Sequence, residues 1–207
     1  NSSDYAAPAN PQIVHADKHY LAFNPLTPGT LYECNDGGVY KSTNGGLTWT
    51  DISNGLVIGQ MYSISNAQTS SDVMLAGLQD NGSIGYDQGS WVQVTGGDGM
   101  VCHIDPLDAN YIYASYANGV LYRITVSPVT FTTISENIPG GQQAGEWVTP
   151  YLLDPNDPGV IFAGYEGLYR SANRGDTWTL KGTPVPGSKM NYLAIAPTNS
   201  NTIYAGY

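Results

Sequence analysis

Residues 38–49 of the chain are Gly-Val-Tyr-Lys-Ser-Thr-Asn-Gly-Gly-Leu-Thr-Trp, and residues 167–178 are Gly-Leu-Tyr-Arg-Ser-Ala-Asn-Arg-Gly-Asp-Thr-Trp. The first glycine, the tyrosine, a basic residue, the serine, the asparagine, a later glycine, the threonine and the tryptophan keep the same spacing in both copies. A phrase of this length that recurs with its spacing intact is typical of a protein built from repeated units. The two copies therefore predict a repeat architecture.

A second landmark recurs between and beyond the two copies. Short hydrophobic runs that follow a polar turn align on Tyr32, Leu75, Tyr113, Phe162 and Tyr204, which are successively 43, 38, 49 and 42 residues apart. A period of roughly 40–50 residues made of short strands is the period of β-propeller blades.

Each repeat is predicted to contain four strands. In the first repeat they fall at residues 19–23, 30–35, 39–42 and 48–52, where Tyr, Val, Ile and Thr gather, while Asn, Asp, Gly and Pro occupy the intervening turns. No stretch has a sustained helical period. The fold class is therefore predicted as all-β, a β-propeller of four-stranded antiparallel blades.

The chain holds about four and a half such blades, because residues 191–207 supply only the first two strands of a fifth repeat. Residues 1–207 are predicted to form a single propeller domain, since the repeat is uniform. Either the N-terminal segment completes the fifth blade, or the chain is part of a larger propeller. We favour the larger propeller because residues 12–17 offer only one plausible N-terminal strand.

Composition narrows the classes of partner. Lys and Arg number 7 against 17 Asp and Glu, which gives a net charge of −10. Nucleic acid is excluded as a partner because phosphates require Lys and Arg clusters, whereas cations, neutral sugars and basic protein surfaces remain. No apolar run reaches the roughly 18 residues of a membrane span, and residues 1–4 do not form a signal peptide.

Cysteine usage and polar composition bear on the compartment. Cys34 and Cys102 fall in non-adjacent repeats, so we expect two unpaired, buried thiols rather than a disulfide. Few Lys residues with many Asn, Thr, Ser and Tyr fit an extracellular or cell-surface location.

The repeated phrase resembles the Asp-box, or bacterial neuraminidase repeat, with Asn44 and Asn173 in place of the usual Asp. Asp-box propellers include sialidases, tandem-propeller xyloglucan-cleaving glycosidases and sortilin-type receptors. The segments 15–19, 35–40, 79–82 and 96–99 further resemble secreted bacterial proteins with sortilin-like propellers. The resemblance covers nearly the whole chain and implies a propeller fold, but it says little about activity.

The resemblance implies that the Asp-box residues are structural and lie at the blade periphery. The asparagine would bond backbone groups in the turn, the second glycine would take a positive φ, and the tryptophan would pack between sheets. The residues concerned are Ser42, Asn44, Gly46, Thr48 and Trp49 in the first copy, and Ser171, Asn173, Gly175, Thr177 and Trp178 in the second.

A ligand site is predicted where the turns between second and third strands open around the central channel. These turns carry polar residues in four successive repeats: Asn35 and Asp36, then Gln79, Asp80 and Asn81, then Asn118, then Glu166. Asp98 and Glu146 should reach the same face. We predict ligand binding by Asp80, Asn81, Asp98, Glu166 and His19; the alternative is that Asp and Asn beside Gly simply form turns.

Asp36 is the candidate catalytic residue. Its segment is similar to the acidic turn of the xyloglucan-cleaving family, where an Asp before a Gly-Gly-aromatic segment is catalytic and a second propeller supplies the other carboxylate. Glycoside hydrolysis requires two carboxyl groups. A sialidase is excluded, because its site requires three arginines, and two of Arg123, Arg170 and Arg174 belong to the repeated phrase.

His15, Asp17 and His19 form a candidate metal site. In an extended segment, residues two apart share a face, which would bring two imidazoles and a carboxylate together. The alternative is that His15 and His19 line the channel entrance and hydrogen-bond to Asp36 or Asp80. Apart from a divalent cation, no cofactor is expected.

The function predicted from the sequence is an extracellular module that binds a polysaccharide, a glycoprotein or a cell-surface protein. Sixteen Tyr and four Trp offer rings for sugar stacking, although a propeller core also uses them. One alternative is a glycoside hydrolase acting on a polysaccharide, and another is a structural subunit of a surface assembly. Enzyme activity stays open, and we favour its absence.

Overall fold

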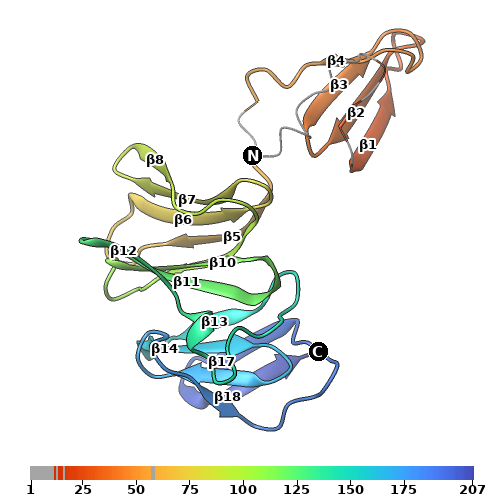
Figure 1. Cartoon of the computed structure of the whole chain (residues 1–207). Helices are drawn as coiled ribbons and strands as arrows, with labels where there is room; N and C mark the ends of the chain where they lie inside the picture. Colours follow the sequence, from red (N-terminus) through yellow and green to blue (C-terminus); the bar gives the residue numbers. More distant parts are fainter. Residues whose placement is uncertain (1–11, 13, 16, 57–58) are drawn as a thin grey trace. The chain divides into compact units, whose positions relative to one another are not determined.

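The computed structural model describes residues 12, 14, 15, 17–56 and 59–207. All regular elements among them are β-strands apart from two single-turn 3-10 helices, η1 (Ala117–Gly119) and η2 (Ser135–Asn137) (Figure 1). The chain divides into two compact units, Asn1–Gln60 and Met61–Tyr207. Each unit is described by itself, and the single domain over residues 1–207 stays a prediction.

The described part of the first unit contains one antiparallel sheet with strands in chain order, made of β1 (Lys18–Phe23), β2 (Leu31–Asn35), β3 (Gly38–Ser42) and β4 (Thr50–Asp51). The first three strands begin and end within a residue of the predicted bounds. The fourth strand is shorter than predicted, because the Thr48 N–H donates to Asn44 Oδ1 at 2.9 Å and holds that residue in the turn.

The second unit contains three four-stranded antiparallel sheets and one two-stranded sheet, again with strands in chain order. The second sheet is β5 (Met61–Asn66), β6 (Val73–Leu78), β7 (Gly82–Asp87) and β8 (Ser90–Gln93); the third is β9 (Gly99–Ile104), β10 (Tyr111–Tyr116), β11 (Val120–Val126) and β12 (Val129–Thr133); the fourth is β13 (Tyr151–Asp154), β14 (Asp157–Gly164), β15 (Leu168–Ser171) and β16 (Thr179–Lys181); the fifth is β17 (Tyr192–Ala196) and β18 (Asn199–Gly206). Four complete blades and half of a fifth confirm the predicted fold class.

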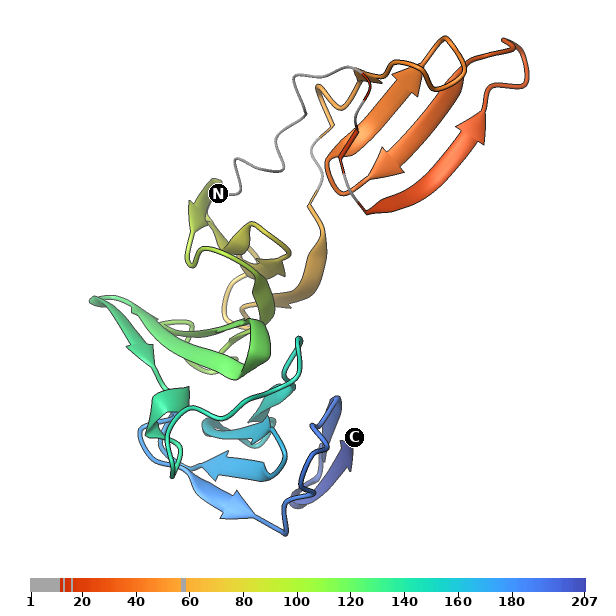
Figure 2. The same ribbon diagram turned by 45° about the vertical axis from the view of Figure 1, so that its right-hand side comes forward.

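The sheets of the second unit stack face to face in chain order (Figure 2). The first strand of each sheet contacts the first strand of the next, from β5 through β9 and β13 to β17. Aliphatic side chains such as Leu75 and Ile112 fill the core between the second and third sheets. An aromatic-rich core that includes Tyr113, Tyr151 and Trp178 lies between the third and fourth sheets. Burial between sheets therefore holds the stack together.

The two Ser-x-Asn-x-Gly-x-Thr-Trp turns have the same hydrogen-bond network. In the second turn, Ser171 Oγ accepts from the Asn173 and Gly175 N–H groups at 3.3 and 2.8 Å, and Asn173 Oδ1 accepts from the Thr177 N–H at 2.9 Å. The corresponding distances in the first turn are 3.3, 2.9 and 2.9 Å. Side-chain oxygens thus bond the turn's backbone donors, as is common for Ser and Asn in turns.

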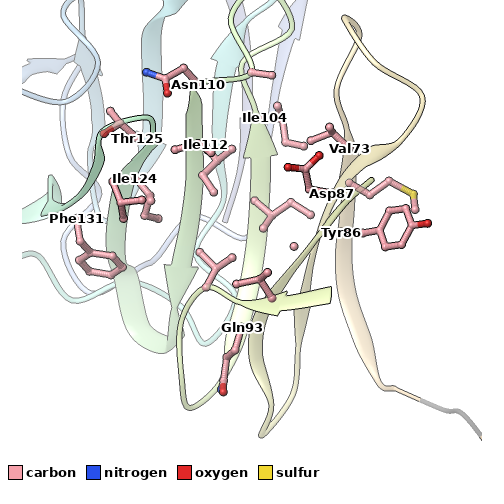
Figure 3. A pocket seen from close by; sticks show the side chains of 18 residues that line it. Val73, Tyr86, Asp87, Gln93, Ile104, Asn110, Ile112, Ile124, Thr125 and Phe131 are labelled. Atoms are coloured by element: carbon pink, nitrogen blue, oxygen red, sulfur yellow. The ribbon is translucent and has the colours of Figure 1, made fainter. Parts of the chain in front are cut away.

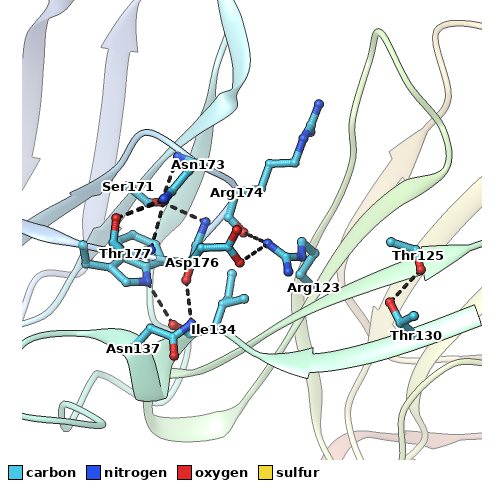
Figure 4. Close-up of polar contacts among 12 residues, drawn as sticks. Arg123, Thr125, Thr130, Ile134, Asn137, Ser171, Asn173, Arg174, Asp176 and Thr177 are labelled. Carbon is cyan, nitrogen blue, oxygen red and sulfur yellow. Dashed lines mark hydrogen bonds and ion pairs between the residues drawn. The ribbon is translucent and has the colours of Figure 1, made fainter.

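The second of these turns packs against the third sheet (Figure 4). Trp178 is 4% exposed, and its Nε1–H donates to the Ile134 carbonyl at 2.9 Å. Arg123 on β11 donates through Nη1 to Asp176 Oδ1 and to the Arg174 carbonyl, both at 2.8 Å. The indole and the guanidinium together fix the fourth sheet against the third.

An ion pair lies beside this contact. Arg174 pairs with the fully buried carboxylate of Asp105, and its guanidinium lies 4.0 Å from the centre of the Tyr111 ring. Burial alone would lower the pKa of Arg174, but hydrogen bonds to Asp105 and Tyr113 raise it, so the guanidinium stays charged. Removing either partner would leave an uncompensated charge at the sheet interface.

Trp49 was expected to be as buried as Trp178 but is only half-buried. The two side chains occupy matching positions, because the next residue pairs with Lys41 in one sheet and with Arg170 in the other. Trp178 is covered by the third sheet, whereas the described part of the first unit holds a single sheet.

Neither cysteine among the described residues forms a disulfide, as expected. Cys102 is buried, but Cys34 is only half-buried, which corrects the expectation that both thiols are buried. No helix in the described part of the chain is long and apolar enough to cross a membrane.

We expect Gly175→Ala to destabilise the second unit more than Gly182→Ala. Both glycines have positive φ, +89° and +72°, so both substitutions incur the left-handed strain of about 1–2 kcal/mol. A Cβ at Gly175 would also lie 2.6 Å from Ile134 Cβ, whereas no atom lies within 4 Å of a Cβ at Gly182. Overpacking should add about 1–3 kcal/mol at Gly175 alone. Urea denaturation of the two variants measures the difference, and equal midpoints would contradict the packing described.

Candidate functional site

Three turns of the second unit meet at one end of its sheets. They are the β6–β7 turn at residues 79–81, the β10–β11 turn that contains η1, and the β14–β15 turn at residues 165–167. The Asn118 N–H donates to the Trp147 carbonyl at 3.3 Å, and the Tyr165 hydroxyl donates to the Gly119 carbonyl at 2.7 Å. We call this end of the second unit the turn face.

A relay of side chains crosses the turn face from the second sheet to the segment before β13. The Tyr62 hydroxyl donates to Gln79 Oε1 at 2.7 Å, and Trp147 Nε1–H donates to the same hydroxyl at 3.1 Å. Trp147 is nevertheless 45% exposed. The relay therefore fixes the orientation of an indole ring that is open to solvent.

Acidic and amide groups lie beside the relay. The Asp80 N–H donates to Asp98 Oδ1 at 3.0 Å, and Asn81 Nδ2 donates to the Gln79 carbonyl at 3.1 Å. Asp80 has a φ of 59° and Asn118 a φ of 61°, a left-handed conformation that Asp and Asn tolerate better than most residues. The Asp80 backbone is thus bonded to the Asp98 side chain, while ligand binding by these two residues stays a prediction.

Another exposed ring and a further acid belong to the turn face. Tyr116 packs so closely over the backbone of Gly97 that a Cβ there would lie 2.4 Å from a ring carbon. Glu166 Oε1 accepts from the Gly187 N–H at 3.0 Å, which ties the β14–β15 turn to the segment before β17. Glu146, whose carbonyl accepts from Thr149 Oγ1 at 2.8 Å, precedes Trp147 directly.

These groups match the chemistry of sugar recognition. Tyr and Trp rings present a flat apolar face with a polar edge, and carboxylate and amide groups accept and donate hydrogen bonds to hydroxyls. Tyr62 and Trp147 were not among the predicted site residues. The sequence signal for Trp147 was a tryptophan in a loop rich in Gly and Gln, but nothing in the sequence linked it to Tyr62.

The first unit holds a separate polar cluster at the β2–β3 turn. His19 Nε2 on β1 pairs with Asp36 Oδ1, and the Asp36 side chain is only 11% exposed. Asn35 supports the turn by accepting from the Gly37 N–H at 2.9 Å and by donating to Glu33 Oε2 at 2.6 Å. The structure thus brings His19 and Asp36 together, as the alternative for this histidine proposed.

Glu33 was missed from the sequence. It faces the same side of β2 as Leu31 and Asn35 and is 2% exposed. Its Oε1 has no hydrogen-bond partner among the described residues. Burial raises the pKa of the neighbouring Tyr40 hydroxyl, and the charges of Asp51 and Glu33 raise it further. Sequence reasoning could have found Glu33 as the acid at an inward position of an alternating strand.

The expected extended segment with His15, Asp17 and His19 on one face is wrong. Asp17 has a φ of 53° and β1 begins only at Lys18, so the alternation of an extended strand is broken between the histidines. His15 is buried against Gly37, while His19 is largely exposed. No group of three or more His, Cys, Asp or Glu in the described part of the chain could hold a metal ion. Residues 13 and 16 of the expected N-terminal strand lie outside the described residues.

Comparison with known proteins gives one curated relative and several similar folds. No family model matches the chain. A xyloglucanase of Hypocrea jecorina (strain QM6a) is 30% identical over 141 residues, which cover 56% of this chain and 17% of that protein. The chain therefore spans about a sixth of the curated relative that it matches.

Two solved structures agree with the architecture. The GH74 xyloglucanase from Xanthomonas campestris has a TM-score of 0.56 at 18% identity, with 92% of this chain and 35% of that chain covered. The Cps50 (Swd1) β-propeller domain from Myceliophteria thermophila has a TM-score of 0.52 at 11% identity, with 87% of this chain and 60% of that chain covered. At these identities the comparison shows the propeller fold alone.

We expect Tyr62→Phe to release the Trp147 indole without unfolding the second unit. The hydroxyl bridges Gln79 and Trp147, but all three groups are partly open to water, so stability should change by less than about 1 kcal/mol. The indole N–H resonance of Trp147 should shift in ¹H–¹⁵N spectra and exchange faster with solvent. Tyr116→Phe is the matched control and should leave that resonance in place; an unchanged resonance in Tyr62→Phe would contradict the relay.

Proposed function

We propose that the chain binds a neutral polysaccharide on the turn face of its second unit. The observation that carries this proposal is the relay from Gln79 through Tyr62 to Trp147, which orients a solvent-exposed indole beside acidic and amide groups. A sugar ring would stack on the indole, and Asp80 and Asp98 would accept hydrogen bonds from its hydroxyls.

Charge selects among polysaccharides. The net charge of −10 repels sulfated or uronic-acid polymers as it repels nucleic acid. The relative and one of the similar structures are named as xyloglucanases. Xyloglucan is therefore the first candidate ligand, and the extracellular or cell-surface location is part of this proposal.

Trp147→Ala should weaken binding of xyloglucan oligosaccharides by about tenfold or more, because an aromatic anchor that the bound ligand buries carries a large share of binding energy. Trp91→Ala is the matched control. Trp91 is also solvent-exposed, but it packs against Tyr86 at the opposite end of β7. Isothermal titration calorimetry with the 207-residue chain measures both affinities.

Three results would contradict the proposal. They are no binding to any neutral polysaccharide of a panel, equal losses in the two Trp variants, or tighter binding to polyuronic acids than to xyloglucan. Binding only to a glycoprotein whose sugars have been removed would instead favour a protein partner.

A second candidate function is glycoside hydrolysis, and the cluster in the first unit favours it. Asp36 is a largely buried carboxylate paired with His19, and the buried Glu33 on β2 accepts a hydrogen bond from Asn35, the last residue before the turn. Hydrolysis requires two carboxyl groups about 5–10 Å apart, one of them protonated. The sequence resemblance assigns the second carboxylate to another propeller, so we favour binding for these residues alone.

We expect the 207-residue chain to release no reducing sugar from xyloglucan, and Asp36→Asn to leave that result unchanged. Asp176→Asn, which alters an acid of the β15–β16 turn in the fourth sheet, is the control. Reducing-sugar release by the parent chain that persists in Asp176→Asn and disappears in Asp36→Asn would overturn the binding proposal and establish the hydrolase.

A further inference from the structure

A cavity of about 560 Å³ opens between the second and third sheets, away from the turn face (Figure 3). Val73, Tyr86 and Val94 line it from the second sheet, and Ile112, Ile124 and Phe131 line it from the third. This volume lies within the range of about 300–1,000 Å³ that is typical of small-molecule sites. Its apolar lining with a few polar groups is typical of such sites as well.

The strand registers show which positions of the three complete sheets correspond. In the third sheet, Arg123 on the third strand pairs with Tyr113 on the second strand and with Thr132 on the fourth. Gly85 holds the corresponding place in the second sheet, because it pairs with Leu75 on the second strand and with Val92 on the fourth. Phe131 of the third sheet corresponds to Trp178 of the fourth sheet. Each directly precedes the residue that pairs with the arginine of its own sheet, which is Arg123 for Phe131 and Arg170 for Trp178. Val94 likewise corresponds to Ile134, since each donates its N–H to the matching carbonyl of its own sheet.

In the gap between the third and fourth sheets, side chains at these positions fill the space. The Trp178 indole occupies the gap and donates to the Ile134 carbonyl, and Arg123 closes it by binding Asp176. The turn of residues 171–177 directly precedes Trp178, whose indole is buried in the gap.

In the gap between the second and third sheets, the same positions leave space. β11 and β12 are joined by Ser127 and Pro128 alone, so no long turn enters the gap. Phe131, at the position of Trp178, packs against Tyr122 with its ring tilted by 44° and remains 53% exposed. Gly85, at the position of Arg123, contributes no side chain.

We propose that this cavity binds a planar aromatic small molecule of about the size of an indole. The occupant follows from the chain's own structure, because the corresponding gap between the next two sheets holds an indole. The occupant is neutral or cationic, because Asp87 lies in the lining and the chain carries a net charge of −10. This site is separate from the turn face and independent of polysaccharide binding.

The test uses three probes that share one ring system: indole, tryptamine as the cation and indole-3-acetate as the anion. Binding to the 207-residue chain is measured from methyl chemical shifts of Val73, Val94 and Ile124. Gly85→Leu should fill the cavity, because Gly85 has no positive φ and a Cβ there meets only Val94 Cγ2 at 3.4 Å and two carbonyl oxygens at 3.9 Å. Gly96→Leu is the matched control, since Gly96 also has no positive φ and no atom lies within 4 Å of its Cβ.

We expect indole and tryptamine to shift these methyl resonances and indole-3-acetate to bind more weakly. Gly85→Leu should reduce indole affinity by about tenfold or more, while Gly96→Leu should change it by less than about twofold. Val92→Phe, at an exposed lining residue, is a second filling variant and decides the outcome if Gly85→Leu does not fold.

The proposal is wrong if millimolar indole leaves the methyl resonances unchanged, or if a folded filling variant binds indole as tightly as the parent chain. It is also wrong if the parent chain is a dimer that either filling variant dissociates, because the cavity would then be an interface between two copies.

Discussion

Contact between successive sheets is the constraint on which the second unit depends. Each hydrogen-bonded ladder is confined to one sheet, so side chains hold one sheet against the next. Between the third and fourth sheets this contact combines the buried Trp178 indole with the charged Arg174–Asp105 pair. Between the second and third sheets it relies on smaller aliphatic side chains. The two interfaces therefore join successive sheets in the same order but differ in their packing and their chemistry.

The turn face inherits its geometry from this stacking. Tyr62 belongs to the second sheet, Asn118 to a turn of the third, and Trp147 to the segment that enters the fourth. These groups meet only because consecutive sheets are stacked in chain order. A change at a sheet interface would therefore displace site residues that it does not touch, since packed interiors transmit strain.

The fold could be predicted from the sequence, whereas the site could be predicted only in part. Turn residues and apolar runs specify where strands begin and end, and their period gave four and a half blades. The sequence also predicted that Asp80 and Glu166 lie in turns between the second and third strands of their sheets, because equivalent turns recur in each repeat; their role in ligand binding stays a prediction. Hydrogen bonds between side chains that are distant in the sequence leave no pattern in the sequence near either residue. The bond between Tyr62 on β5 and Trp147 in the segment before β13 was therefore missed.

Two errors have specific physical causes. The metal hypothesis assumed a regular strand through Asp17, but a single left-handed residue rotates every later side chain relative to the earlier ones. Glu33 was overlooked because an acid in a strand ordinarily faces solvent. In this sheet the alternation of β2 places Glu33 on the buried face with Leu31 and Asn35, and Asn35 donates a hydrogen bond to it.

The unequal interfaces also bear on how such a chain diverges. Duplicated blades begin as copies with identical gaps between adjacent sheets. Each gap is formed only by the two sheets beside it, as in other quasi-linear repeat proteins. A short hairpin, such as the one between Val126 and Val129, inserts no side chain into the gap beside it and leaves the other gaps unchanged. Selection can then act on the unfilled gap alone. A repeat protein can therefore acquire a new recognition surface by losing an inserted side chain between two sheets as readily as by gaining a loop.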